Sequence, residues 1–252
     1  MTMKQLILIV LFSLISFFSF GWGEVGHHII VQIAKAHVTK NIQDSVNKYL
    51  GTMSWESAST WMDDMRRNAE YAYFKTWHYI NIEKDMPYDS AKTGTDNVYV
   101  QLQNAINNLK NKKNLSLKQI TFNLKILFHL MGDFHQPLHV GYGIDRGGNE
   151  IKVNFLGKRT NLHAIWDTDI IEQANISFEN VNALSQKKIY KNLKEVNLLK
   201  WMTKTRKMLV AVYHFSNPIE SKYIEDSKHI IQHQLLLAGL RLAQILTITF
   251  SV

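Results

Sequence analysis

The sequence predicts an all-α fold: a single, mainly helical domain with one small β-hairpin. Apolar side chains recur at helical spacing through most of the 252 residues, and only 3 prolines interrupt them. Hydrophobic residues make up 46% of the chain, which suffices for one sizeable core and excludes a disordered protein. No repeat, low-complexity tract or linker divides the sequence, so one domain is expected.

Residues 1–21 have the pattern of a secretory signal peptide. An apolar stretch from Leu6 to Phe20 follows a single lysine, and the small residues needed for cleavage stand at its end. The stretch is shorter than the roughly 20 apolar residues of a membrane span, although an uncleaved anchor is the alternative. We expect cleavage after Gly21, a mature domain of residues 22–252, a secreted or periplasmic location and no stable membrane association.

The helical periodicity predicts the remaining elements in order. The expected helices cover 24–37, 41–50, 55–68, 95–112, 116–134, 162–173, 188–214 with a break, and 220–248. Between the fifth and sixth of these, Ile151, Val153 and Phe155 alternate with polar residues, and Leu156-Gly157-Lys158 supplies a turn. This alternation predicts the hairpin.

Charge and cysteine content limit the chemistry. Lys and Arg number 29 against 21 acidic residues, a formal charge of +8, which favours an anionic partner such as nucleic acid or anionic lipid. The absence of cysteine excludes disulfides, thiolate metal sites and cysteine nucleophiles, so any metal must be held by His, Asp, Glu or backbone. A secreted protein without cysteine is also more typical of a bacterial envelope.

Two His-x-x-x-Asp pairs are the most informative pattern. His129 and Asp133 lie four residues apart on a predicted helix, and therefore on one face about 6 Å apart along the axis. Pro137 should end that helix, so that His139 extends from the following loop. His163 and Asp167 repeat the spacing. Together these five ligands exceed what one zinc ion needs.

Further ligand candidates lie outside these pairs. Asp63 and Asp64 follow Trp61, and His78 stands between aromatic residues. If Trp22 becomes the N-terminus, its α-amine and carbonyl can chelate a metal beside His27, which an internal tryptophan could not do.

Each candidate also has an ordinary structural interpretation. A single His or Asp on a helix is usually at the surface or hydrogen-bonded in the core, and the pairs could be simple helix pairs. The other histidines are interpreted as structural: His28, His37, His135, His214, His229 and His233. Arg66 and Arg67 could form a solvated face, but Arg66 lies within one turn of Asp63 and could reach an anion bound there.

These motifs together resemble the trinuclear-zinc type I nucleases of fungi, plants and bacteria, the mung bean nuclease type, with the phospholipase C/nuclease fold. The matching segments are WGxxGH from Trp22, WxDxxR from Trp61, HYI from His78, HxxGDxxQPLH from His129, GGN from Gly147 and NLHxxWD from Asn161. Their order is collinear up to Asp167, and beyond that only the helical character is shared.

The resemblance implies three Zn²⁺ ions. One site would use Asp63, His78, His129 and Asp133. A close neighbour would use the amine and carbonyl of Trp22, His27 and a bridging Asp133. The third would use His139, His163 and Asp167.

The resemblance also implies substrate contacts. Arg66 matches an arginine that neutralises phosphate, and Tyr79 matches the aromatic position that stacks a nucleobase. Asn81 stands where fungal members carry an acidic residue that hydrogen-bonds the base, so base preference is open. The loop between His139 and Gly147 is one residue longer than in the fungal members.

The implied activity is endonucleolytic hydrolysis of single-stranded DNA and RNA to 5′-phosphorylated products by a monomer, with 3′-nucleotidase activity on nucleotides left open. Zinc-bridging Asp133, together with Asp63 and Arg66, would form the catalytic group. Two alternatives remain: a zinc-dependent phospholipase C of the same superfamily, and a secreted zinc-binding protein without catalysis.

Overall fold

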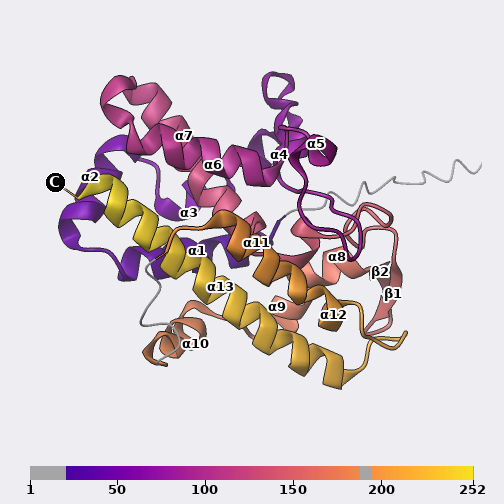
Figure 1. The fold of residues 1–252 in the computed structure, drawn as a ribbon. Helices are drawn as coiled ribbons and strands as arrows, with labels where there is room; N and C mark the ends of the chain where they lie inside the picture. The colour runs from indigo at the N-terminus through magenta and orange to yellow at the C-terminus, as the bar shows by residue number, and fades with distance from the viewer. Residues whose placement is uncertain (1–20, 188–194, 252) are drawn as a thin grey trace, which may run out of the picture.

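The computed structural model describes residues 21–187 and 195–251 (Figure 1). Residues 1–20 of the expected signal peptide and residues 188–194 of the expected helix 188–214 lie outside the described residues. Within the described ranges the chain is mainly helical, and its sheet is a single antiparallel pair of strands. The predicted all-α fold with one hairpin is confirmed.

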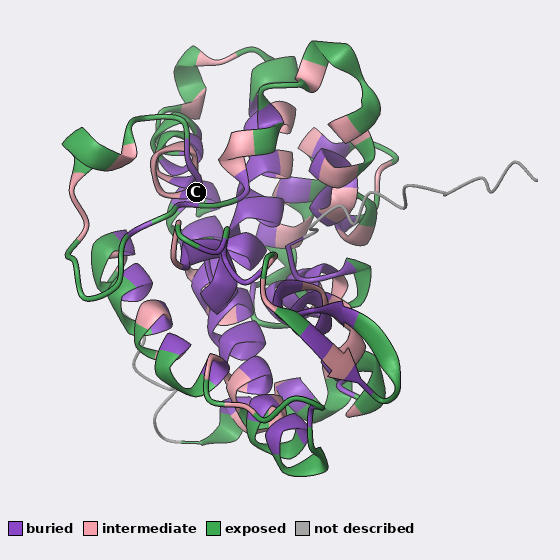
Figure 2. Cartoon of the chain, turned by 90° about the vertical axis from the view of Figure 1, so that its right-hand side faces the viewer, coloured by how far each residue is buried: buried purple, intermediate pink, exposed green. Residues whose placement is uncertain are grey.

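Four long helices build the core of the fold. They are α1 (Glu24–Ala36), α3 (Trp55–Asp64), α7 (Leu117–Asp133) and α13 (Ser221–Phe250). Helix α1 packs against α13 and α3, while α7 packs against α3 and α6 (Val98–Lys110). Helix α2 (Lys40–Leu50) contacts α7 and α13. The inner faces of the helices are buried and their outer faces exposed (Figure 2). This arrangement places one face of α1, α3 and α7 around a common interior.

Helix α7 shows how local sequence fixes an element that carries ligands. Ser116 accepts a hydrogen bond from the Gln119 backbone, and its own backbone N–H donates 2.9 Å to Gln119 Oε1, which is a capping box. The helix ends at Asp133, and Pro137 begins the 3₁₀ turn η4 (Pro137–Val140). The predicted stop before Pro137 is confirmed.

Helix α13 runs diagonally across the molecule (Figure 1) and lies directly on α1. A Cβ at Gly239 would lie 2.6 Å from Ile33 Cβ, so glycine permits this close approach. Among the described residues only α13 is long and apolar enough to cross a membrane, but 72% of its most apolar 18-residue stretch is buried within the fold. It therefore has the burial of a core helix.

The hairpin pairs β1 (Lys152–Phe155) with β2 (Lys158–Asn161). Leu156 and Gly157 link the strands with φ of 50° and 84°, the positive values that a two-residue hairpin turn requires. Val153 and Phe155 are buried on one face. The predicted turn and alternation are thus confirmed.

Several predicted boundaries differ in detail. The helix expected over 55–68 ends at Asp64 and continues as the 3₁₀ turn η1 (Met65–Arg67). The one expected over 95–112 begins at Val98, because Asn97 caps it. The segment 162–173 consists of α8 (Leu162–Ala164), a π-helical turn η5 (Ile165–Asp169) and α9 (Ile170–Gln173).

The last third of the chain has additional short elements. The described part of 188–214 forms α11 (Leu198–Lys207) and α12 (Leu209–Val212); a break was expected in this segment, and the structure has one at Met208. Three short helices were not predicted, because four to six residues carry too little periodicity to distinguish them from loops. They are α4 (Phe74–Trp77), α5 (Ser90–Thr93) and α10 (Phe178–Ala183).

Candidate metal centre

Helix α7 places two ligand candidates against α3 and the segment after α4. His129 Nε2 lies 3.2 Å from Asp133 Oδ2 and 2.9 Å from His78 Nδ1. His78 Nδ1 is itself 2.9 Å from Asp133 Oδ2. Asp63 Oδ1, from α3, lies 3.9 Å from His129 Nε2 and 4.0 Å from His78 Nδ1. Asp63, His78 and His129 form a first group that could hold a metal ion, and Asp133 contacts both of its histidines.

A second group consists of His27, His129 and Asp133, and therefore shares His129 with the first. His27, from α1, lies 3.5 Å from the other Asp133 oxygen, Oδ1, and its ring stacks on His129 at 4.2 Å. A Cβ at Gly132 would lie 2.6 Å from His27 Nδ1, so glycine at this position of α7 lets the histidine reach the centre. The shared His129 and the fully buried Asp133, whose two oxygens face His27 and His78, make the two groups contiguous.

The N-terminal segment borders this second group. Trp22 is fully buried, and the next residue, Gly23, donates its backbone N–H 2.8 Å to Asp167 O. A Cβ at Gly21 would overlap Asp133 Oδ1 and lie 2.9 Å from His27 Nε2. The residue before Trp22 therefore occupies the space that Asp133 and His27 face.

The third group lies beside the first two. His139 Nε2, from η4, is 3.0 Å from His163 Nε2, and His163 Nε2 is 3.2 Å from Asp167 Oδ2. His139 Nδ1 lies 3.8 Å from Asp133 Oδ1, which connects this group to the others. We call the three groups together the metal centre; its members are His27, Asp63, His78, His129, Asp133, His139, His163 and Asp167.

Backbone carbonyls orient three of the imidazoles. His129 Nδ1 donates to Ser59 O, His139 Nδ1 to His78 O and His163 Nδ1 to Gly147 O, each at 2.6 Å. With Nδ1 as the donor, the neutral ring presents the Nε2 lone pair, which is the form that binds a metal. The Nε2 lone pairs of His139 and His163 then face each other, and a cation between them would satisfy both.

Several buried polar atoms of the centre have no hydrogen-bond partner, which also favours a bound cation. Both nitrogens of His27 and one oxygen of Asp133 are buried without a hydrogen-bond partner. Such groups are costly unless they are paired or coordinate a metal. The donor set of imidazoles and carboxylates suits zinc, so the residues present fit this metal.

The pKa values report a buried set of charges. Burial alone would raise the pKa of the Asp133 carboxyl, but His129 and His139 outweigh it and hold this pKa well below its usual range. Burial alone would lower the pKa of His129, yet Asp133 and Asp63 raise it to about 9. A proton on His129 thus balances the carboxylates, and a metal ion would supply that charge instead.

Burial dominates the other shifts. It lowers the pKa of His78 to about 4 and that of His163 to about 3, so both rings are neutral at pH 7. Burial raises the pKa of Asp167 well above its usual range. Neutral imidazoles are the protonation state that coordination needs.

The predicted substrate contacts lie at the edge of the centre. Arg66 Nε is 3.1 Å from Asp63 Oδ1, and its side chain is 16% exposed. Tyr79 follows His78 and is 37% exposed, so its ring is accessible. Asn81 is exposed on the same segment, beside the backbone of Gly143.

Three supporting groups were not predicted from the sequence. Gln136 Nε2 donates 2.7 Å to Asp167 Oδ1, and the carbonyls of Ser59 and Gly147 orient His129 and His163. Gln136 stands inside the QPLH motif, which could have drawn attention to it. A backbone carbonyl leaves no signal in a sequence, so Ser59 could not have been found.

His135, inside the same motif, lies outside the three groups. Its Nδ1 donates 2.7 Å to Met131 O, and its Nε2 accepts 2.7 Å from Arg241 on α13. Its bonds therefore tie the end of α7 to α13.

Comparisons with known proteins agree with this arrangement. Residues 22–251 match the family model described as S1/P1 Nuclease. The chain is 30% identical to Endonuclease 2 of Arabidopsis thaliana over 92% of its own length and 91% of that protein. It is 31% identical to Nuclease S1 of Aspergillus oryzae, over 62% of this chain and 56% of that one. Nuclease P1 of Penicillium citrinum is 28% identical over 58% and 57%.

The family match starts at Trp22 and extends past the centre to the end of α13. It therefore covers every residue of the metal centre and the helices that support it. The chain belongs to the S1/P1 nuclease family.

Proposed function

We propose that the protein is a secreted, zinc-dependent endonuclease that hydrolyses phosphodiester bonds of single-stranded DNA and RNA to 5′-phosphorylated products. The observation that carries the proposal is the contiguous metal centre, in which each of three His/Asp groups has a histidine within 4 Å of Asp133. Relatives named nucleases and endonucleases support the reaction class. The formal charge of +8 favours a polyanionic substrate.

Three Zn²⁺ ions are the proposed cofactors. The first would be held by Asp63, His78, His129 and Asp133. The second would be held by the Trp22 amine and carbonyl, His27 and Asp133. The third would be held by His139, His163 and Asp167. When bound, zinc supplies Lewis acidity and lowers the pKa of water towards neutrality.

The protein's own groups would position the substrate around this centre. Asp133 joins two groups with one carboxylate, and Asp63 holds the Arg66 guanidinium in place. Arg66 would offset the charge that develops on the phosphate oxygens. Tyr79 would stack on a base, and Asn81 would hydrogen-bond its edge. Because a base must be unstacked to reach Tyr79, single strands should be preferred over duplex.

Processing at the N-terminus belongs to the same proposal. Gly21 stands against Asp133 and His27, so removal of residues 1–21 would open the space that the Trp22 amine is to use. The start of the family match at Trp22 supports a mature domain of 22–252. Export to the periplasm or the medium would follow from the signal peptide. The burial of α13 supports the absence of a stable membrane association, and a monomer is the proposed form.

The test is direct. Protein produced with its own leader is purified, and its N-terminal sequence and zinc content are measured together. Turnover is then compared on single-stranded DNA, single-stranded RNA, duplex DNA and a phosphocholine ester. We expect Trp22 at the N-terminus, about three zinc ions and faster cleavage of single strands. Release of phosphocholine with intact nucleic acid would favour a phospholipase, and zinc uptake without any turnover would favour a non-catalytic protein.

A further inference from the structure

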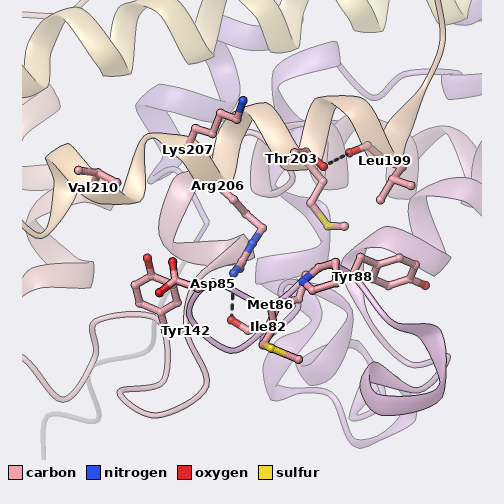
Figure 3. A pocket seen from close by; sticks show the side chains of 12 residues that line it. Ile82, Asp85, Met86, Tyr88, Tyr142, Leu199, Thr203, Arg206, Lys207 and Val210 are labelled. Carbon is pink, nitrogen blue, oxygen red and sulfur yellow. Dashed lines mark hydrogen bonds between the residues drawn. The ribbon is translucent and has the colours of Figure 1, made fainter.

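A cavity of about 430 Å³ lies between helices α11 and α12 and the segment that follows Ile82 (Figure 3). Its lining includes Tyr88 and Tyr142 on one side and Leu199 and Arg206 on the other. None of these residues belongs to the metal centre. Cavities of this size accommodate small organic ligands.

The cavity is built on the two segments that carry the substrate site. Ile80 N donates 2.8 Å to His139 O, and Ile82 N donates 3.1 Å to Gly141 O, so the segment after His78 runs beside the segment after His139. One segment carries Tyr79 and leads to Ile82 in the lining. At the rise of an extended chain, Tyr79 and Ile82 are about 10 Å apart.

Arg206 on α11 hydrogen-bonds to both of these segments. Its Nη1 donates to Val140 O at 2.5 Å and to Gly141 O at 3.1 Å, and its Nη2 donates to Ile82 O at 3.1 Å and to Glu83 O at 3.2 Å. Figure 3 shows the guanidinium directed from α11 towards Ile82. The cavity and the predicted base-stacking residue therefore lie on segments that hydrogen bonds join directly.

The lining combines apolar, aromatic and cationic groups. Met86, Leu199 and Val210 are 47%, 44% and 78% exposed, so three large apolar side chains meet water at one place. Exposed apolar clusters of this kind mark binding sites. The Arg206 guanidinium lies 5.7 Å from the Tyr142 ring, and no carboxylate in the described part of the chain forms an ion pair with it. A ligand with a flat aromatic ring and a separate negatively charged group fits this combination.

We propose that the cavity is a second nucleotide subsite for the single strand whose phosphodiester lies at the metal centre. The base of a neighbouring nucleotide would pack between Tyr88, Leu199 and Tyr142. Its phosphate would lie on the Arg206 side, attracted by the charge of a guanidinium whose Nη1 and Nη2 already donate to backbone carbonyls. Asp85, an exposed acidic residue of the lining, remains free to hydrogen-bond the base edge. The inference rests on the proposed function, because it assigns the occupant as the same substrate strand.

The test uses two variants of the lining, one at the exposed Leu199 and one at the half-buried Tyr88, with a matched control. Leu199→Asp places a charge in the cavity, and Tyr88→Ala removes an aromatic wall. Leu117→Asp is the control, because Leu117 and Leu199 are both exposed leucines in the first turn of a helix, α7 and α11 respectively. An acidic residue is tolerated in a first turn, so neither Asp variant should disturb folding.

Binding is measured by fluorescence anisotropy with the purified, zinc-containing protein. The probes are a labelled phosphorothioate octathymidylate, which resists hydrolysis, and the corresponding dinucleotide. The wild-type protein should bind the octanucleotide more tightly than the dinucleotide. Each cavity variant should weaken octanucleotide binding by about tenfold, the loss typical of one base stack. Dinucleotide binding should change far less, and Leu117→Asp should change neither.

The outcomes separate this inference from the proposed function. Equal losses on both probes, or unchanged octanucleotide binding in both cavity variants, would overturn the subsite. Cleavage of unmodified oligonucleotide is measured in parallel. If the wild-type protein cleaves but the cavity variants bind the octanucleotide as tightly as it does, the proposed function stands and the subsite does not. If the cavity variants bind the octanucleotide more weakly but the wild-type protein does not cleave, the cavity binds the strand and the proposed nuclease activity is wrong.

Discussion

Replacing Asp133 by asparagine tests the architecture of the metal centre most directly. The Asp133 side chain is fully buried, with Oδ2 2.9 Å from His78 Nδ1 and Oδ1 3.5 Å from His27 Nε2. Asparagine keeps the shape but removes the charge that two groups share. The third group does not depend on this carboxylate, since His139 Nδ1 already donates to His78 O.

The expected result follows from that geometry. Zinc content should fall from about three ions per chain to about one, since two sites lose a shared ligand. Turnover on single-stranded DNA should fall at least about 100-fold, the scale of losing a group that stabilises developing charge. Elemental analysis and initial rates measure the two effects, and circular dichroism checks that helicity is kept.

The matched control is Asp64→Asn, an exposed neighbour of Asp63 on α3 that lies outside the centre. It should keep its zinc and stay within about twofold of the wild-type rate, as a surface substitution does. If Asp133→Asn retained three zinc ions together with normal turnover, one carboxylate would not join two sites, and the reasoning would be wrong.

Four further predictions test other parts of the molecule. A single residue added before Trp22 in the mature protein should lower zinc content and activity while leaving helicity intact; unchanged activity would remove the α-amine from the site. Tyr79→Ala should raise the Michaelis constant several-fold, by the loss of about 1–3 kcal/mol of stacking, at constant zinc content; equal loss of zinc would assign the ring a structural role. Gln136→Leu should weaken zinc binding at the third group about 10- to 100-fold, because it removes the hydrogen bond to Asp167, and competition with a chelator would measure this; an unaltered affinity would show that the bond is dispensable. Gly239→Ala should lower the free energy of unfolding by about 1–3 kcal/mol, because the added Cβ would press on α1. Denaturant titration measures this change, and an unchanged unfolding midpoint would show that α1 accommodates the methyl group.

Local sequence predicted the elements whose signals are complete within one segment. The periodicity around His129 and the stop before Pro137 predicted α7 within one residue at either end, and the structure shows a capping box at Ser116 that begins it. The alternation around Val153 and the turn at Gly157 likewise define the hairpin. These features depend on backbone geometry and on residues a few positions apart, which a sequence displays directly.

Other features escaped prediction for a physical reason. Helices α4 and α5 span four residues each, too short for a hydrophobic face to repeat. The π-helical turn at Ile165–Asp169 changes the angular offset between side chains without changing the sequence spacing. The Arg206 contacts join three segments that are far apart in the chain, and no local pattern announces them.

The sequence by itself determined which side chains are available for coordination. The spacing of His129 with Asp133 follows from helix geometry, the same spacing pointed to His163 and Asp167, and His27, Asp63, His78 and His139 stood out as further candidates. The family resemblance then grouped these candidates into three sites. Only the tertiary structure decided that these side chains meet, that Asp133 faces two groups at once, and that the carbonyls of Ser59, His78 and Gly147 turn the imidazole rings towards one interior. The reason is physical. Spacing along a helix fixes neighbours within one element, whereas the distance between α1, α3, α7 and η5 depends on how their buried faces pack, with glycines at Gly132 and Gly239 setting how closely they approach.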